Sequence, residues 1–397
     1  MLLTFLGLAV TMLSVLLAYR IFRETGGTNA YALVAESFLN GSPSASTCFG
    51  ADCAIFQGKT FIVFPPLPGL LAIPLVLWHG IHATGFIAIS VLFLAGSLLL
   101  WRRLLSFYGL QASETLWLLA AIGFASPLYY VTLRGDGVWF FAQSAAFFFV
   151  TLSLHEAVLT RRFWSAGLAL GCAFLCRQMS IFYAPLILLL SLEGEPLLRV
   201  TAARIRTAVQ IGLPVLAALI LYFGYNYWRF GDPLNTGYNY INFAASTGML
   251  HERVGAYGLW NKSYAVFNLF YMFIQGFHAE FADPAYVKLS GMDQAGTSIL
   301  AASPWLLLMF FAPANRKTCA VLAMMAAFTL TLVFYHSNGF SQYNVQRYCL
   351  DWLPAALLVI APLLTPERLT WARLLIVWGV VLNLATVCVL GVTHSVS

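Results

Sequence analysis

Charged residues are scarce in this chain of 397 residues, and that scarcity decides its broad class. Asp, Glu, Lys and Arg together make up 9% of the sequence, whereas hydrophobic residues make up 60%. Soluble domains carry about 25% charged residues. The composition therefore excludes an ordinary soluble domain and predicts a polytopic membrane protein.

A concentrated basic run is also missing. The net charge of +6 is scattered along the chain, and nothing resembles the Lys/Arg clusters that follow a nucleic-acid backbone. Nucleic acid is therefore not an expected partner.

Several motifs of common chemistries are absent too. The sequence has no P-loop, no dinucleotide-binding glycine pattern, no zinc-ligand spacing and no Ser-His nucleophile context. It also lacks the paired, Gly/Pro-broken apolar segments in two matching halves that mark many secondary transporters, which disfavours transport without excluding it.

The first apolar stretch, 1–19, lacks two features of a secretory signal. It has no basic residues at its start and no small-residue cleavage site before Arg20. We expect an uncleaved first membrane span.

Cysteines are few, and only two of the seven flank a polar loop. Cys48 and Cys53 enclose "CFGADC", so they form a disulfide if the loop faces an oxidising compartment, or remain two free thiols. The others lie in apolar segments, where a thiol behaves as a small hydrophobe; these are Cys172, Cys176, Cys319, Cys349 and Cys388.

Apolar runs long enough to form membrane helices are abundant, so the predicted fold is all-α. We expect about eleven transmembrane helices in a single transmembrane domain, 1–397. They lie near 1–19, 84–101, 114–132, 138–155, 163–176, 178–192, 207–227, 298–312, 318–335, 349–363 and 371–392. The proline-rich segment 66–79 is too short to cross and is interpreted as re-entrant or interfacial.

Lys and Arg collect in alternate short loops, which orients the chain. If 66–79 does not cross, these loops all fall on the cytoplasmic side, with the N-terminus inside and the C-terminus outside. The external side then carries two long loops, 20–65 and 228–297, and the short loop 336–348. Aromatic residues are dense in the long loops, so we expect interfacial helices there.

The first external loop contains a predicted hairpin. In "CFGADCAIFQGKTFIVFPPLPG" the "QGKT" turn separates two apolar strands, and we expect Asp52 and Lys59 to face one another. Asp52 then suits a general base and Lys59 a phosphate contact. The alternative is that both side chains are simply solvated.

Two arginines near the predicted membrane surface are candidate phosphate ligands. Arg347 and Asp351 are four residues apart, so on an α-helix they share one face, either as a structural ion pair or with Asp351 orienting Arg347 toward an anionic headgroup. Tyr348 lies beside them. Arg229, after the seventh apolar run, is either a headgroup contact or an interfacial snorkelling cation.

The remaining acidic residues give weaker signals. A possible divalent-cation site in the second long loop has no specific ligand spacing; it would draw on His278, Glu280, Asp283 and Asp293. Arg134 and Asp136, in "LRGDG", are interpreted as structural residues of a turn.

A set of segments, in order, resembles a known family. These are "YALVAESFLNG" (31–41), "DCAIFQGKTFIVFPPLPGLLAIP" (52–74), "VWFFAQ" (138–143), "NYWRFGDPLNTGY" (226–238), "GTSILAASPWLLL" (296–308) and "QYNVQRYCLDWLPAALL" (342–358). They are similar to bacterial membrane glycosyltransferases of the GT-C fold, the proteins described as family 39-like or dolichyl-phosphate-mannose protein mannosyltransferase-like. Each motif alone has low specificity, and the resemblance depends on the order in which the motifs occur.

The resemblance implies an inverting transferase of the bacterial inner membrane. In that family a sugar enters on a polyprenyl phosphate, and a carboxylate of the first external loop deprotonates the hydroxyl of an acceptor glycan, lipid or protein. Basic residues neutralise the leaving phosphate. The pair Arg347 and Asp351 matches a family position; the other roles follow from location.

The sequence departs from the family pattern at its first external turn. Similar proteins carry Asp, or Asp-Glu, where this chain has Thr28 and Asn29, neither of which acts as a base near neutral pH. The nearest acids are Glu24 and Asp52, so Asp52 is the first candidate base and Glu24 the second. The alternative is a protein of the same fold that binds or flips a lipid-linked sugar without catalysis.

Overall fold

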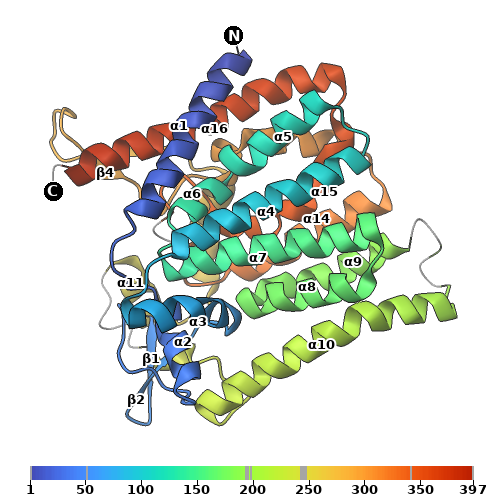
Figure 1. Cartoon of the computed structure of the whole chain (residues 1–397). Coiled ribbons are helices and arrows are strands. Elements are labelled where there is room, and N and C mark those ends of the chain that lie inside the picture. The colour runs from blue at the N-terminus through green and yellow to red at the C-terminus, as the bar shows by residue number, and fades with distance from the viewer. Residues whose placement is uncertain are drawn as a thin grey trace. The chain divides into compact units, whose positions relative to one another are not determined.

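The computed structural model is predominantly helical (Figure 1). It describes residues 2–50, 52–192, 196, 199–241, 248–339 and 342–395, with the backbone alone for 391–395. Within these ranges the named strands form two antiparallel hairpins. The predicted all-α membrane class is therefore confirmed.

Six helices are long and apolar enough to cross a membrane. They are α1 (Leu2–Phe22), α4 (Phe86–Phe107), α7 (Val138–His155, extended by a π-helical turn to Thr160), α10 (Ala202–Phe230), α14 (Arg316–Val333) and α16 (Pro366–Ser395). A seventh span results if α5 (Ala112–Phe124) and α6 (Pro127–Leu133), bent by 49°, are counted together. The chain is thus a polytopic membrane protein.

The expected number of about eleven transmembrane helices is too high by this length criterion. Four predicted spans are short: α8 (Phe163–Cys176), a 3-10 turn with α9 (Gln178–Ser191), α13 (Ile299–Ala302) with a 3-10 helix (Pro304–Phe311), and α15 with its following turn (Leu353–Leu363). At 1.5 Å per residue, fourteen α-helical residues rise only about 21 Å, against a hydrocarbon core of about 30 Å. Hydropathy counts apolar residues but does not locate the breaks between helices.

The remaining elements are short and belong mainly to the predicted external loops. They are α2 (Ala30–Leu39), β1 (Cys53–Phe56), β2 (Lys59–Ile62), α3 (Leu67–His79), α11 (Met249–Tyr257), α12 (Ala265–Phe273), β3 (Ala279–Phe281) and β4 (Leu289–Met292). The segment 66–79, expected not to cross, thus forms the thirteen-residue α3. Its place in or on the membrane stays a prediction.

The chain divides into two compact units, and each is described by itself. Unit 1 comprises 1–19, 101–131 and 259–397; unit 2 comprises 20–100 and 132–258. The expectation of a single transmembrane domain stays a prediction.

In unit 1, α16 packs along α5 through small residues, and side-chain hydrogen bonds fix the end of α5. A Cβ on Gly379 would lie 2.8 Å from the Ala125 side chain, so glycine permits the close approach. Asn383 donates to the Phe124 carbonyl and Trp305 to the Ala125 carbonyl, both at the end of α5. These bonds satisfy carbonyls that the helix end leaves without intrahelical partners.

Unit 2 is built on α7, α8 and α10, which lie side by side (Figure 1). A Cβ on Gly167 would lie 2.5 Å from the Ile211 carbonyl oxygen, and one on Gly171 would lie 3.2 Å from that of Pro214. Small residues let helix backbones approach closely in an apolar environment. At one end of these helices lie α2, α3 and the hairpin of β1 and β2.

The predicted hairpin is confirmed, with a turn of two residues. Gln57 and Gly58 have φ of +50° and +74°, the signature of the type I′ turn that matches the twist of paired strands. The strands pair in register from Cys53 opposite Ile62 to Phe56 opposite Lys59.

Candidate acid–base site in unit 2

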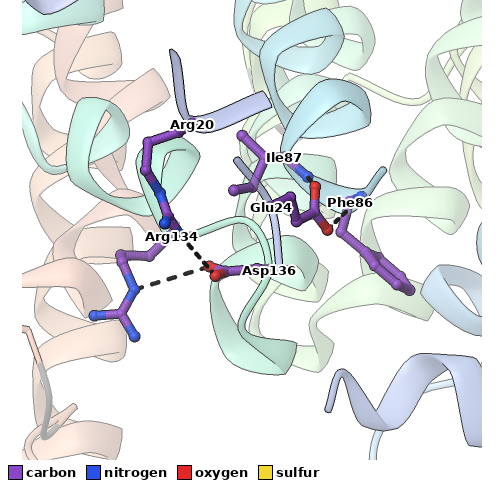
Figure 2. A network of polar contacts seen from close by, with 6 residues as sticks. All are labelled: Arg20, Glu24, Phe86, Ile87, Arg134 and Asp136. Carbon is purple, nitrogen blue, oxygen red and sulfur yellow. Dashed lines mark hydrogen bonds and ion pairs between the residues drawn. The ribbon is translucent and has the colours of Figure 1, made fainter. Parts of the chain in front are cut away.

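The turn "RETGGTN" is fixed against the start of α4. Both carboxylate oxygens of Glu24 accept backbone N–H bonds, from Phe86 and Ile87, each at 3.0 Å (Figure 2). The Gly27 N–H donates to the His82 carbonyl at 3.2 Å. Glu24 thus satisfies N–H groups at the positive end of α4, where a carboxylate is stabilising.

Glycine is required at position 27 by this contact. A Cβ there would lie 2.3 Å from the Ala83 carbonyl oxygen, which is closer than real Cβ contacts. Any side chain would push the turn away from α4 and lengthen the bonds of Glu24.

The departure from the family pattern, Thr28 and Asn29, has a local structural role. Asn29 is buried and is the N-cap of α2; its side-chain oxygen accepts the Tyr31 N–H at 3.0 Å. Thr28 is exposed. Because Asp and Asn cap helices about equally well, capping alone does not explain why the acid is absent.

Asp136 lies close to this turn and is bound by two arginines. Its Oδ2 is 2.8 Å from the Arg20 guanidinium, and its Oδ1 is 3.8 Å from Nε of Arg134 (Figure 2). Arg20 comes from the end of α1, whereas Arg134 and Asp136 lie in the turn between α6 and α7. The site therefore holds two carboxylates and two guanidinium groups within one unit.

From the sequence, Arg134 and Asp136 are expected to be structural, and Arg20 is not among the candidate residues. The available signal was that all three lie at ends of apolar runs, where ionisable groups usually have a task. Their pairing was not readable, because Arg20 and Asp136 are 116 positions apart.

The environment of Glu24 shifts its pKa. Burial raises the pKa of the carboxyl above its usual value, the N–H groups at the start of α4 oppose this, and the negative charge of Asp136 adds to the rise. A raised pKa suits a general base. Both oxygens already accept backbone bonds, however, so proton transfer through Glu24 would weaken the start of α4.

Asp52 and Lys59 do not face one another, which corrects the predicted arrangement. Lys59 is exposed at the turn end, opposite Phe56, whereas half-buried Asp52 directly precedes Cys53 at the other end of the ladder. At about 3.3 Å per residue these positions are roughly 13 Å apart along the strands. The turn between two apolar runs predicts the hairpin but not which residues lie at its two ends.

The two loop cysteines are joined. Cys48 and Cys53 form a disulfide, which decides between the two alternatives left by the sequence. The bridge closes a short loop around Asp52 and restrains the backbone next to it.

Arg229 is buried rather than exposed to headgroups. The residue is only 3% exposed. One Nη donates to the Ile62 carbonyl, and the other donates to the Asn226 Oδ1 at 2.6 Å. The guanidinium carbon lies 4.0 Å from the centre of the Tyr225 ring. Neither a snorkelling cation nor an open headgroup contact describes this geometry.

The candidates Arg347, Tyr348 and Asp351 lie in unit 1. They belong to a 3-10 helix, Arg347–Asp351, which has three residues per turn, so positions four apart are rotated by about 120°. The expected shared α-helical face is therefore wrong. Arg347 is buried and its Nε donates to the Gly339 carbonyl at 2.6 Å, with the Tyr348 ring centre 4.9 Å from its guanidinium.

The acids of the second long loop serve that loop. Asp283 accepts backbone N–H bonds, among which the bond from Lys288 contributes most to lowering its pKa. Asp293 accepts the Tyr271 hydroxyl at 2.6 Å and the Ala295 N–H. Across the described residues, no three His, Cys, Asp or Glu side chains are grouped so that they would hold a metal ion.

Comparisons with known proteins give one structural similarity. No family model matches the chain, and no curated protein matches it. The crystal structure of ArnT from Cupriavidus metallidurans bound to undecaprenyl phosphate is similar, with 14% sequence identity and a TM-score of 0.46. The match covers 92% of this chain and 61% of that one, so the chain spans about three fifths of the length of ArnT.

Proposed function

We propose that this chain is an integral membrane glycosyltransferase of the GT-C type, which transfers a sugar from a polyprenyl-phosphate carrier to an acceptor at the external face. The ordered sequence resemblance suggests the family, and the membrane-spanning helices suit a lipid-linked donor. The observation that carries the proposal is the cluster of charged residues in unit 2, which comprises Arg20, Glu24, Arg134 and Asp136. Carboxylates and guanidinium groups gather there at the ends of apolar helices, where charge is costly unless it has a task.

The proposed reaction is a single inverting displacement. A carboxylate takes the proton of the acceptor hydroxyl while that oxygen forms a bond to the anomeric carbon. The bond from this carbon to the phosphate oxygen breaks, and polyprenyl phosphate leaves with the electron pair. The chain must therefore supply a base on one side of the sugar and positive charge on the other.

Asp52 is the base that we propose. The disulfide and the paired strands hold the backbone beside it, and a held carboxylate is what general-base catalysis needs. Glu24 is the weaker candidate because both its oxygens hold the start of α4. Asp136 is already paired with Arg20, so we assign it to orienting the arginines.

Arg134 is a further phosphate contact that we propose. Its side chain is 37% exposed, the most open of the three charged groups in the ion-pair cluster, and Asp136 lies beside it. A guanidinium oriented by a carboxylate suits the planar recognition of phosphate oxygens. Lys59 remains a proposed contact on the same hairpin as Asp52. Arg347, Tyr348 and Asp351 remain proposed donor-binding residues of unit 1.

The test is sugar transfer by the purified chain in proteoliposomes. Radiolabelled polyprenyl-phosphate hexoses and pentoses are supplied singly, together with an envelope fraction from cells that lack this chain. We expect transfer from one donor, and a loss of about 10²-fold or more in Asp52→Asn, because removing a general base costs 10²–10⁴-fold.

The control is Asp232→Asn, the same chemical change at an exposed turn residue, which should retain activity. Full activity in Asp52→Asn together with loss in Glu24→Gln would move the base to Glu24, the second candidate. If no donor supports transfer, the proposal that the chain is an enzyme is contradicted.

A second function is favoured by one observation, the presence of Asn29 where similar proteins carry an acid. A chain of this fold without a base would bind or flip the lipid-linked sugar. This second function predicts saturable binding of the donor with no turnover. Turnover by the isolated wild-type chain would rule it out.

A further inference from the structure

Arg229 connects the end of α10 to the hairpin that carries Asp52. One Nη donates to the carbonyl of Ile62 on β2, and the other to Asn226 one turn back on α10. The Tyr225 ring lies 4.0 Å from the guanidinium carbon and the Phe230 ring lies 4.9 Å from it. The guanidinium of Arg229 therefore joins α10 to β2. The two residues in contact, Arg229 and Ile62, are 167 positions apart in the sequence.

Burial keeps the guanidinium away from a lipid phosphate, although its Nε has no hydrogen-bond partner among the described residues. Both Nη groups have protein acceptors and the residue is buried. An aromatic face and two oxygen acceptors stabilise the positive charge locally. The geometry therefore favours a fixed internal role over a contact that opens and closes around a lipid headgroup.

The carbonyl that Arg229 holds belongs to the backbone beside Asp52. Ile62 pairs with Cys53 in the sheet register, and Asp52 directly precedes Cys53. Cys53 is bound to Cys48 by the disulfide, and the next residue, Ala54, forms a bridge to Ile241. The backbone next to Asp52 is thus restrained by the disulfide, by the strand pairing and, through Ile62, by Arg229.

We propose that Arg229 is a positioning residue for Asp52. It sets the place of the hairpin relative to α10, and so the place of the carboxylate, without touching the donor phosphate. This inference rests on the proposed function, in which Asp52 is the general base.

Arg229→Lys separates the two roles, because lysine keeps the positive charge but has no fork to join Ile62 and Asn226. If Arg229 positions Asp52, kcat falls by about 10²-fold, the cost of a misplacement of about 1 Å, while KM for the active polyprenyl-phosphate donor is unchanged. A phosphate contact would instead raise KM for the donor, and it would lower kcat as well to the extent that it stabilises the leaving phosphate.

A double-variant cycle distinguishes positioning from general damage. In an Asp52→Asn background, Arg229→Lys should lower the residual kcat by less than about twofold, since coupled residues are non-additive. A fall as large as that in the wild-type background would contradict the proposal. Arg206→Lys, an exposed arginine near the other end of α10, is the matched control.

Hydrogen exchange measures the anchoring without catalysis. Amides of 53–62 should exchange faster in Arg229→Lys than in the wild type or in Arg206→Lys, and Asn226→Ala should act in the same direction if the lysine variant does not fold. Unchanged exchange in both variants would overturn the inference. A wild type that transfers no sugar would overturn the proposed function and the role of Asp52, whereas the exchange result would still decide whether Arg229 anchors the hairpin.

Discussion

At the scale of single residues, Glu24 shows how a candidate base becomes a helix cap. Because burial raises its pKa above the reference value of 4.5, the folded protein binds this proton more tightly than the unfolded chain. Because burial outweighs the N–H bonds at the start of α4, folding favours the protonated carboxyl. This contribution is present below about pH 4.5 and is lost as the pH rises through the folded-state pKa. We expect wild-type stability to fall relative to Glu24→Gln across that window, as measured by thermal unfolding in one detergent from acid to neutral pH. Exposed Glu252→Gln is the control, and a difference between wild type and Glu24→Gln that does not vary with pH would contradict this assignment.

At the scale of elements, the hairpin depends on its two-residue turn. Gly58 has φ of +74° with open space around the position of a Cβ, so a substitution there tests backbone strain without steric clash. Gly58→Val should destabilise the hairpin by about 1–2 kcal/mol, because a β-branched residue is disfavoured in the left-handed region. Gly58→Asn should cost less, since asparagine tolerates that region. Hydrogen exchange of β1 and β2 measures the effect, and equal exchange in the two variants would show that the turn does not govern the hairpin.

At the scale of the whole molecule, the distribution of Lys and Arg predicts orientation. With the five free cysteines replaced by alanine, Ser263→Cys should react with a membrane-impermeant maleimide in intact cells, because 228–297 is expected outside. Gln111→Cys, between α4 and α5 and on the same side as Arg102 and Arg103, should react only after the membrane is permeabilised. Both positions are exposed in the structure, so exposure alone does not separate them. The reverse pattern would place the N-terminus outside and contradict an external reaction site.

The sequence by itself determined the membrane class, the positions of the helical segments and the hairpin. These depend on local properties: runs of apolar residues bury themselves in lipid, and Gln57-Gly58 between apolar residues favours a tight turn. Local patterns also left errors, because breaks such as the one between α5 and α6 and the 3-10 geometry of Arg347–Asp351 are not visible in hydropathy.

Only the tertiary structure decided how the charged residues are used. Glu24 meets α4 across 62 positions, Arg20 meets Asp136 across 116, and Arg229 meets Ile62 across 167. No periodicity relates residues so far apart, and which groups meet depends on how helices pack and where each ends. The same reason separates Asp52 from Lys59, since strand register placed them at opposite ends of one short hairpin.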